Sequence, residues 1–189
     1  MMMKQTGRPA SERIAYGALL VAMQIVLGNL LQIPLPTKQF NLGFLPIALA
    51  GAYFGAPTAV VVGALGDFFG AHLFPAGPYF PGFTLTAALV GLLYGLILYG
   101  RKASLWRLAA ACAAVALCNL FLNSYWLTYF VPKGYWVLVG SRALTYLIDI
   151  PLSILVIYLV LRGLGKLNRP PAAPEVEEAK ADGEEGDSL

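Results

Sequence analysis

Long apolar segments, separated by short polar or proline-rich breaks, are the dominant pattern of this 189-residue chain. The first segment, Ile14 to Ile33, is long enough for one membrane span of about 20 residues, and Pro34 and Pro36 end it. Between Gln39 and Tyr99 the only formal charge is Asp67. That stretch is far too long for one span, so it predicts several helices.

Two breaks divide the long stretch, one at Gly55-Ala56-Pro57 and one in the loop from Phe74 to Gly82. Two further apolar runs follow and are separated by Val131-Pro132-Lys133-Gly134. The pattern predicts an all-α membrane protein with six transmembrane helices. The predicted spans cover residues 14–33, 40–55, 57–73, 83–99, 108–130 and 138–161.

Composition supports this fold class and gives the domain boundaries. Hydrophobic residues make up 58% of the chain and charged residues 12%, whereas a soluble domain carries about 25% charged residues. A single six-helix domain is predicted over residues 14–167. It follows a polar N-terminal tail, 1–13, and precedes a Pro-rich and acidic tail, 168–189, whose composition predicts disorder.

Basic residues set the predicted orientation, because Lys and Arg are enriched in cytoplasmic loops. With six spans both termini lie on one side, and Lys38 and Lys133 are the basic loop residues of the opposite side. We therefore expect both termini in the cytoplasm. The basic residues on the terminal side are Lys4, Arg8, Arg13, Arg101, Lys102, Arg107, Arg162, Lys166, Arg169 and Lys180.

Polar residues inside the predicted spans gather in their outer halves. Asp67 and Asn119 lie near mid-membrane, counted at about 1.5 Å per helical residue. Asn123 and Trp126 share a helical face with Asn119. An ionisable residue in a membrane helix is a functional hypothesis by default.

The sixth span continues this pattern in its outer third, where Arg142 shares a face with Tyr146 and Asp149. The loop before the fourth span brings Tyr79, Phe80, Phe83 and Thr84 to the same depth. These positions predict a cavity that opens to the exterior. Two other interpretations stay open: polar groups that only join helices, and aromatic rings that only form an interfacial belt.

Small residues form stripes on three predicted helices, and such faces allow close helix contact. One stripe is Ala59, Gly63, Gly66 and Gly70, and another is Ala87, Gly91 and Gly95. The third stripe, Ala15, Ala18 and Ala22 on the first span, contains a pair spaced four residues apart. Internal packing and docking to a partner membrane protein both explain these stripes.

The runs FNLGFLPIALAGAYFG and GALGDFFGAHLFPAGPYFPGFTLTA, with the later Arg142 and Pro151, resemble the S components of energy-coupling factor (ECF) vitamin importers. The block LFPAGPYFPGFTLTA is most similar to the folate-type branch, and the resemblance covers roughly residues 11–165. It implies a six-helix subunit of a prokaryotic plasma membrane that captures a vitamin outside. It also implies a partner module of one membrane scaffold subunit and two ATPases.

In that family an Ala-xxx-Ala pair on the first helix contacts the scaffold, and Ala18 and Ala22 match it. Folate also suits the predicted site, because its pterin edge pairs with carboxylates and amides and its glutamate carboxylates pair with Arg or Lys. The candidate ligand-binding residues are Lys38, Asp67, Tyr79, Phe80, Phe83, Thr84, Asn119, Asn123, Trp126, Arg142 and Tyr146.

Several alternatives stay open from the sequence. The ligand is folate, another pterin or another vitamin, and an autonomous carrier or channel is a second class of function. An intramembrane aspartyl protease needs a second acid beside Asp67, and Asp149 is the remaining candidate within the spans. The chain has no P-loop, so ATP hydrolysis is expected in another chain. No metal site, cofactor or nucleic-acid partner is expected.

Overall fold

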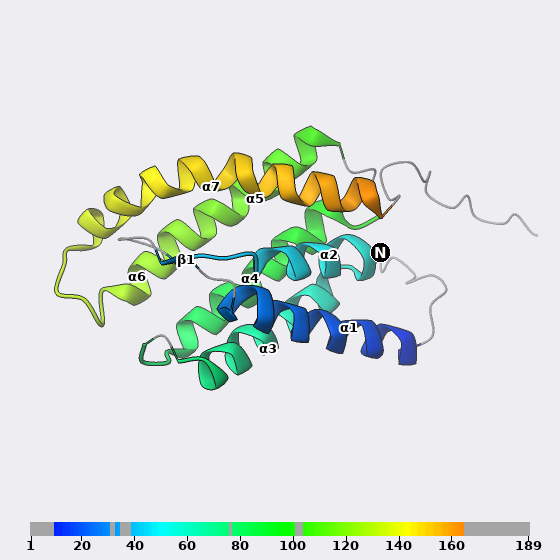
Figure 1. The fold of residues 1–189 in the computed structure, drawn as a ribbon. Helices are drawn as coiled ribbons and strands as arrows, with labels where there is room; N and C mark the ends of the chain where they lie inside the picture. The colour runs from blue at the N-terminus through cyan, green and yellow to red at the C-terminus, as the bar shows by residue number, and fades with distance from the viewer. Residues whose placement is uncertain (1–9, 31–32, 35–38, 76, 101–103, 165–189) are drawn as a thin grey trace, which may run out of the picture.

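The computed structural model describes residues 10–30, 33–34, 39–75, 77–100 and 104–164. Its helices run side by side along the long axis of the molecule, with α5 and α7 above α1 and α3 in Figure 1. The elements are α1 (Ala10–Ile25), η1 (Val26–Leu30), β1 (Ile33–Pro34), β2 (Gln39–Phe40), α2 (Phe44–Phe54), α3 (Ala56–Leu73), α4 (Pro81–Leu98), α5 (Leu105–Cys118), η2 (Asn119–Asn123), α6 (Ser124–Leu127) and α7 (Tyr135–Gly163).

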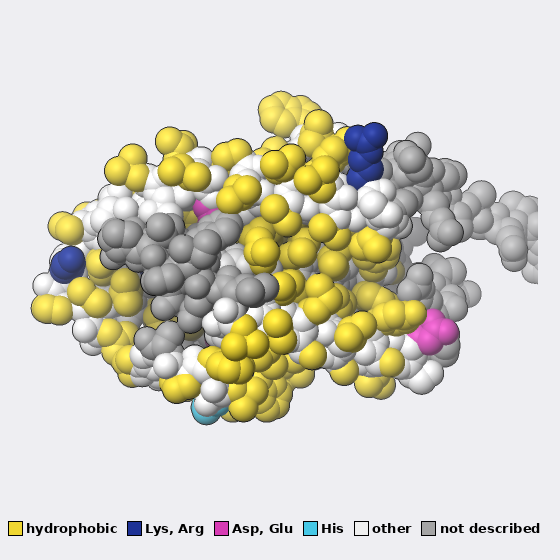
Figure 2. All heavy atoms as spheres, in the orientation of Figure 1, with side chains coloured by type: hydrophobic (Ala, Val, Ile, Leu, Met, Phe, Trp, Pro, Cys, Tyr) yellow, Lys and Arg dark blue, Asp and Glu magenta, His cyan; other side chains and the backbone are white. Residues whose placement is uncertain are grey.

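The regular secondary structure of the described residues is helical apart from one very short strand pair. In this pair β1 runs antiparallel to β2, with Ile33 opposite Phe40. Within the described ranges five helical segments are long and apolar enough to cross a membrane. Hydrophobic side chains cover most of the face in Figure 2, and the few basic side chains in view lie toward its two ends. The fold is that of a multi-pass membrane protein.

The predicted span at 40–55 differs from the helix found there. Helix α2 begins only at Phe44, because the Asn41 side chain accepts a hydrogen bond from the Gly43 amide at 3.1 Å and holds a turn before it. Its 11 residues rise about 16 Å, short of the roughly 30 Å hydrocarbon core. Nine of its residues are buried, so α2 is a central core helix.

Helices α2, α3 and α4 approach one another closely at glycines, where no side chain separates their backbones. A Cβ built on Gly51 of α2 would lie 2.8 Å from the backbone nitrogen of Gly95 on α4. A Cβ on Gly63 of α3 would overlap the Ala87 carbonyl, and one on Gly91 of α4 would overlap the Ala59 carbonyl. Two of the predicted small-residue stripes are therefore used for internal packing.

A single glycine forms the turn between α2 and α3. Gly55 has φ of 87°, a conformation that residues with a side chain rarely adopt. The ring of Tyr99 covers it, with atoms 3.3 Å from where a Cβ would stand. Because Pro57 cannot donate a backbone hydrogen bond, it fits the first turn of α3.

The outer helices differ from the predicted spans mainly in their ends. Helix α1 begins at Ala10, four residues before the predicted domain boundary, and α7 continues to Gly163. These two ends lie at the same end of the bundle, to the right in Figure 1. The predicted C-terminal tail, 168–189, lies outside the described residues.

Candidate functional site

A cavity of about 710 Å³ lies between α1, α2, α3, α4, α5 and α7, within the usual size for a small-molecule site. Parts of the α3–α4 loop and of the α6–α7 connection also line it, so it lies toward the end opposite Ala10 and Gly163. Its polar wall residues are Gln24, Asn29, Asn41, Asp67, Tyr79, Tyr94, Cys112, Asn119, Asn123, Arg142, Tyr146, Asp149 and Ser153.

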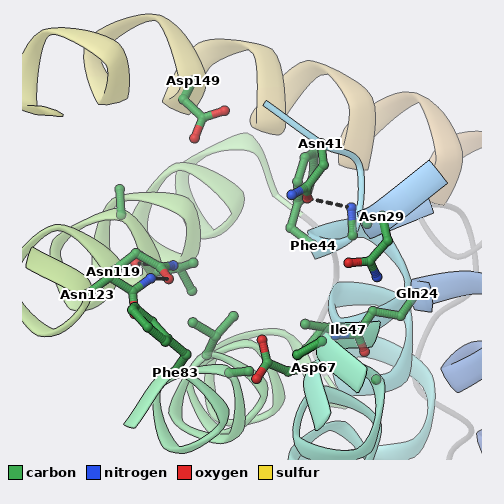
Figure 3. Close-up of a pocket in the computed structure, with 18 of the residues that line it drawn as sticks. Gln24, Asn29, Asn41, Phe44, Ile47, Asp67, Phe83, Asn119, Asn123 and Asp149 are labelled. Carbon is green, nitrogen blue, oxygen red and sulfur yellow. Dashed lines mark hydrogen bonds between the residues drawn. The ribbon is translucent and has the colours of Figure 1, made fainter. Parts of the chain in front are cut away.

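Asp67 enters this cavity from the middle of α3 (Figure 3). Its Oδ2 accepts a hydrogen bond from the Thr84 hydroxyl at 2.7 Å. Because Thr84 has a single hydroxyl proton, it accepts the bond that the Tyr79 hydroxyl makes with it at 3.1 Å. This chain of two bonds fixes the carboxylate and ties it to the α3–α4 loop.

Asn119 and Asn123 stand on η2, a π-helical segment between α5 and α6. Asn119 donates to the Val115 carbonyl, and Asn123 donates to Oδ1 of Asn119, each at 3.0 Å. These bonds are all within one helix, so they do not join helices. Oδ1 of Asn123 is buried, and among the described residues it has no hydrogen-bond partner.

Arg142 and Tyr146 stand one turn apart on α7, and both are buried although they line the cavity. The two side chains interact with each other. Nε of Arg142 has no hydrogen-bond partner among the described residues. A buried guanidinium with an unsatisfied donor suits an anionic ligand group, because carboxylates accept from Arg in paired hydrogen bonds.

Aromatic rings gather at the end of the cavity near the α3–α4 loop. Phe80 stacks on Tyr129 with ring centres 5.7 Å apart, and it also contacts Trp126 at 5.4 Å. Tyr79, Phe80 and Phe83 all line the cavity. This arrangement provides flat apolar walls for a ring-shaped ligand.

Eight of the eleven predicted ligand residues line the cavity, and a ninth, Thr84, lies directly behind its wall. Thr84 binds the wall residue Asp67 and does not itself line the cavity. Trp126 does not line it either, because its indole donates to Thr86 on α4 at 3.1 Å. Lys38 lies outside the described residues.

Three polar wall residues were missed by the sequence analysis: Gln24 and Asn29 on the first helix, and Asn41 before α2. Gln24 lies deep inside the predicted span 14–33, and that polar position in an apolar segment was the available signal. Asp149, which the sequence placed on the same helical face as Arg142 and Tyr146 but which was not named as a ligand-binding residue, also lines the cavity.

The third small-residue stripe has a different environment from the other two. Ala15, Ala18 and Ala22 are exposed on α1, next to the exposed apolar residues Leu19 and Val26. This face is not used for packing within the described part of the chain. It is available for lipid or for another membrane protein.

Fold and cavity together define a multi-pass membrane protein with a partly open cavity whose wall carries polar and aromatic side chains. The sequence matches the family described as "ECF transporter, substrate-specific component" over residues 12–161. The chain therefore belongs to this family of substrate-specific transporter components, which are not enzymes.

Similar proteins narrow the comparison within the family. A folate transporter FolT of Clostridium novyi is 37% identical over 144 residues, which cover 76% of this chain and 84% of the relative. A folate transporter FolT of Leuconostoc mesenteroides is 29% identical, with coverage of 76% and 81%. A crystal structure of FolT bound with folic acid superposes with a TM-score of 0.76 at 27% identity and covers 82% of this chain and 95% of that one.

Proposed function

We propose that this chain is the folate-binding S component of an ECF importer, which takes the vitamin from the extracellular side. The proposal depends on one observation: Asp67, two asparagines, Arg142 and several aromatic rings line the same cavity. Similarity to folate transporters and to a folic acid-bound structure supports the same ligand. An S component for another pterin or vitamin is the second candidate.

Folic acid has parts that match each kind of wall residue. Its pterin edge has donors and acceptors for the Asp67 carboxylate and for Asn119 and Asn123. Its rings fit between aromatic side chains such as Phe80 and Phe83. Its glutamate carboxylates suit Arg142. Lys38 is proposed as a further cation for these carboxylates.

Release of the ligand into the cell requires a partner module in this proposal. The chain has no P-loop, so ATP hydrolysis belongs to two ATPase subunits that act through a membrane scaffold subunit. The exposed face of α1 with Ala15, Ala18 and Ala22 is the proposed docking surface for the scaffold. Small side chains there let two helices approach closely.

The proposed function is tested first with the wild-type protein. We expect folate to co-purify with the chain isolated from cells, and mass spectrometry identifies the bound molecule. Calorimetric titration of ligand-free protein in detergent should then give saturable binding of folic acid. Another vitamin in the co-purified fraction, together with no heat from folic acid, would favour the second candidate.

The proposed topology has six passes, with both termini in the cytoplasm of a prokaryotic cell and the short α2 counted as one pass. Labelling single-cysteine variants with an impermeant maleimide tests it in a background without Cys112 and Cys118. We expect labelling from outside for Lys38→Cys and Lys133→Cys, because these positions lie on the predicted outer side. Arg101→Cys and Lys166→Cys should stay unlabelled, and labelling of either one would reverse the orientation.

Thr84→Val should weaken folic acid binding by roughly threefold to tenfold. The substitution keeps the shape of the side chain but removes the hydroxyl that donates to Asp67. A hydrogen bond to a charged group contributes about 1.5–3 kcal/mol, and because this bond positions Asp67 without touching the ligand, only part of it is lost from binding. Titration calorimetry measures the affinity. Thr58→Val is the matched control, because Thr58 contacts Arg13 and does not line the cavity. Equal affinities for both variants would show that Thr84 does not position Asp67.

A further inference from the structure

Gln24 is a cavity residue whose hydrogen bonds are incomplete. It stands on α1, is only 7% exposed and lines the cavity. Its Nε2 donates to the Gly63 carbonyl on α3 at 3.4 Å. Its Oε1 is buried and has no partner among the described residues. A buried acceptor without a donor costs about 1–3 kcal/mol, so a donor from a bound ligand would relieve this cost.

The position of Gln24 relative to α3 places it beside Asp67. Its amide lies against Gly66, where a Cβ would overlap it, so the absence of a side chain at Gly66 makes room for the amide. Gly66 directly precedes Asp67. Figure 3 shows Gln24 reaching from α1 toward the same region that Asp67 enters from α3.

Both residues carry hydrogen-bond acceptors in this part of the cavity wall. An ionised Asp67 only accepts hydrogen bonds, and Thr84 occupies one side of its Oδ2. The donor group of Gln24 is turned toward the Gly63 carbonyl. Its buried oxygen lies against Gly66, next to Asp67 in the cavity wall, and has no hydrogen-bond partner among the described residues. We call Oε1 of Gln24 and the carboxylate of Asp67 the acceptor pair.

We propose that the acceptor pair binds an amino group on the ligand's ring, with Oε1 of Gln24 accepting one of its two N–H bonds. The inference rests on the proposed function, since the 2-amino-4-oxo ring of folic acid carries such a group. The neighbouring ring N–H and the second amino N–H then face Asp67. Gln24 is a ligand-contacting residue in this arrangement.

A purely structural role for Gln24 predicts a different result. If its bond to Gly63 only joined α1 to α3, its loss would weaken every ligand of the cavity by the same factor. A direct contact instead weakens ligands that carry the amino group more than ligands that lack it. The ratio of two affinities therefore separates the two roles.

The experiment compares folic acid with its 2-desamino analogue by calorimetric titration of the full chain in detergent. We expect the wild type to bind folic acid more tightly than the analogue. Gln24→Met, which keeps the length of the side chain, should weaken folic acid binding about tenfold. The ratio of the affinity for folic acid to the affinity for the analogue should fall by a similar factor. An unchanged ratio in Gln24→Met would overturn the proposal.

Leu20→Ala is the matched control, because Leu20 is buried one turn earlier on α1 and does not line the cavity. It should lower the thermal midpoint while keeping the wild-type ratio. The same narrowing in Leu20→Ala would assign the effect to a loosened α1 and would also overturn the proposal. If Gln24→Met does not fold, Gln24→Asn, whose amide is one methylene shorter, should show the narrowed ratio.

The wild type distinguishes this inference from the proposed function. A wild type that does not bind folic acid contradicts the proposed function, and the inference falls with it. A wild type that binds folic acid and its 2-desamino analogue equally well contradicts only the inference, because an amino group held by the acceptor pair must contribute to affinity.

Discussion

Arg142→Ala is expected to weaken folic acid binding by roughly tenfold or more while the protein stays folded. Arg142 is 9% exposed, lines the cavity and has a buried Nε without a hydrogen-bond partner among the described residues. A guanidinium within the membrane is costly, about 2.5–3.5 kcal/mol on insertion scales. A ligand carboxylate offsets this cost, and losing a charged hydrogen-bond partner typically costs about 1.5–3 kcal/mol.

Calorimetric titration of the purified variant measures this effect, and two further variants make it specific. Arg162→Ala removes an exposed Arg near the end of the same helix and should bind like the wild type. Arg142→Lys keeps the charge but loses the planar fork that pairs with a carboxylate, so an intermediate affinity is expected. Wild-type affinity in Arg142→Ala would mean that the residue has a structural role only.

Ala22→Leu should reduce folate uptake by about tenfold without changing folic acid binding by the isolated protein. Ala22 is exposed in the middle of α1, and the proposed docking surface depends on small side chains. A larger side chain at a close helix contact costs about 1–3 kcal/mol, which separates the helices and weakens docking to the scaffold.

Uptake in cells that contain the whole transporter and binding by the isolated chain are measured side by side. Ala143→Leu is the control, because Ala143 is an exposed alanine on α7, away from the proposed surface. It adds the same volume and should leave uptake unchanged. Unchanged uptake in Ala22→Leu, or an equal loss of binding, would show that this face of α1 is not the docking surface.

Cavity-lining residues could be predicted from the sequence where they lie on one face of a single regular helix. Arg142 and Tyr146 lie one turn apart on α7, and the simple 3.6-residue period was enough to place both on the cavity wall. The same period failed for Trp126. The π-helical segment Asn119–Asn123 interrupts the α-helical spacing, so Trp126 points to Thr86 instead of the cavity. Such segments often occur at functional sites.

The sequence by itself determined the fold class and the breaks between helices, because apolar length and helix-breaking residues act locally. It also predicts mid-membrane depth for Asp67, since that prediction comes from counting residues along one helix. Only the tertiary structure decided that α2 is a short core helix, and that two small-residue stripes pack inside while that of α1 is exposed. It also brought Gln24 of α1 beside Gly66 of α3, because contacts between helices depend on their relative rotation and translation, which the period of a single helix does not contain.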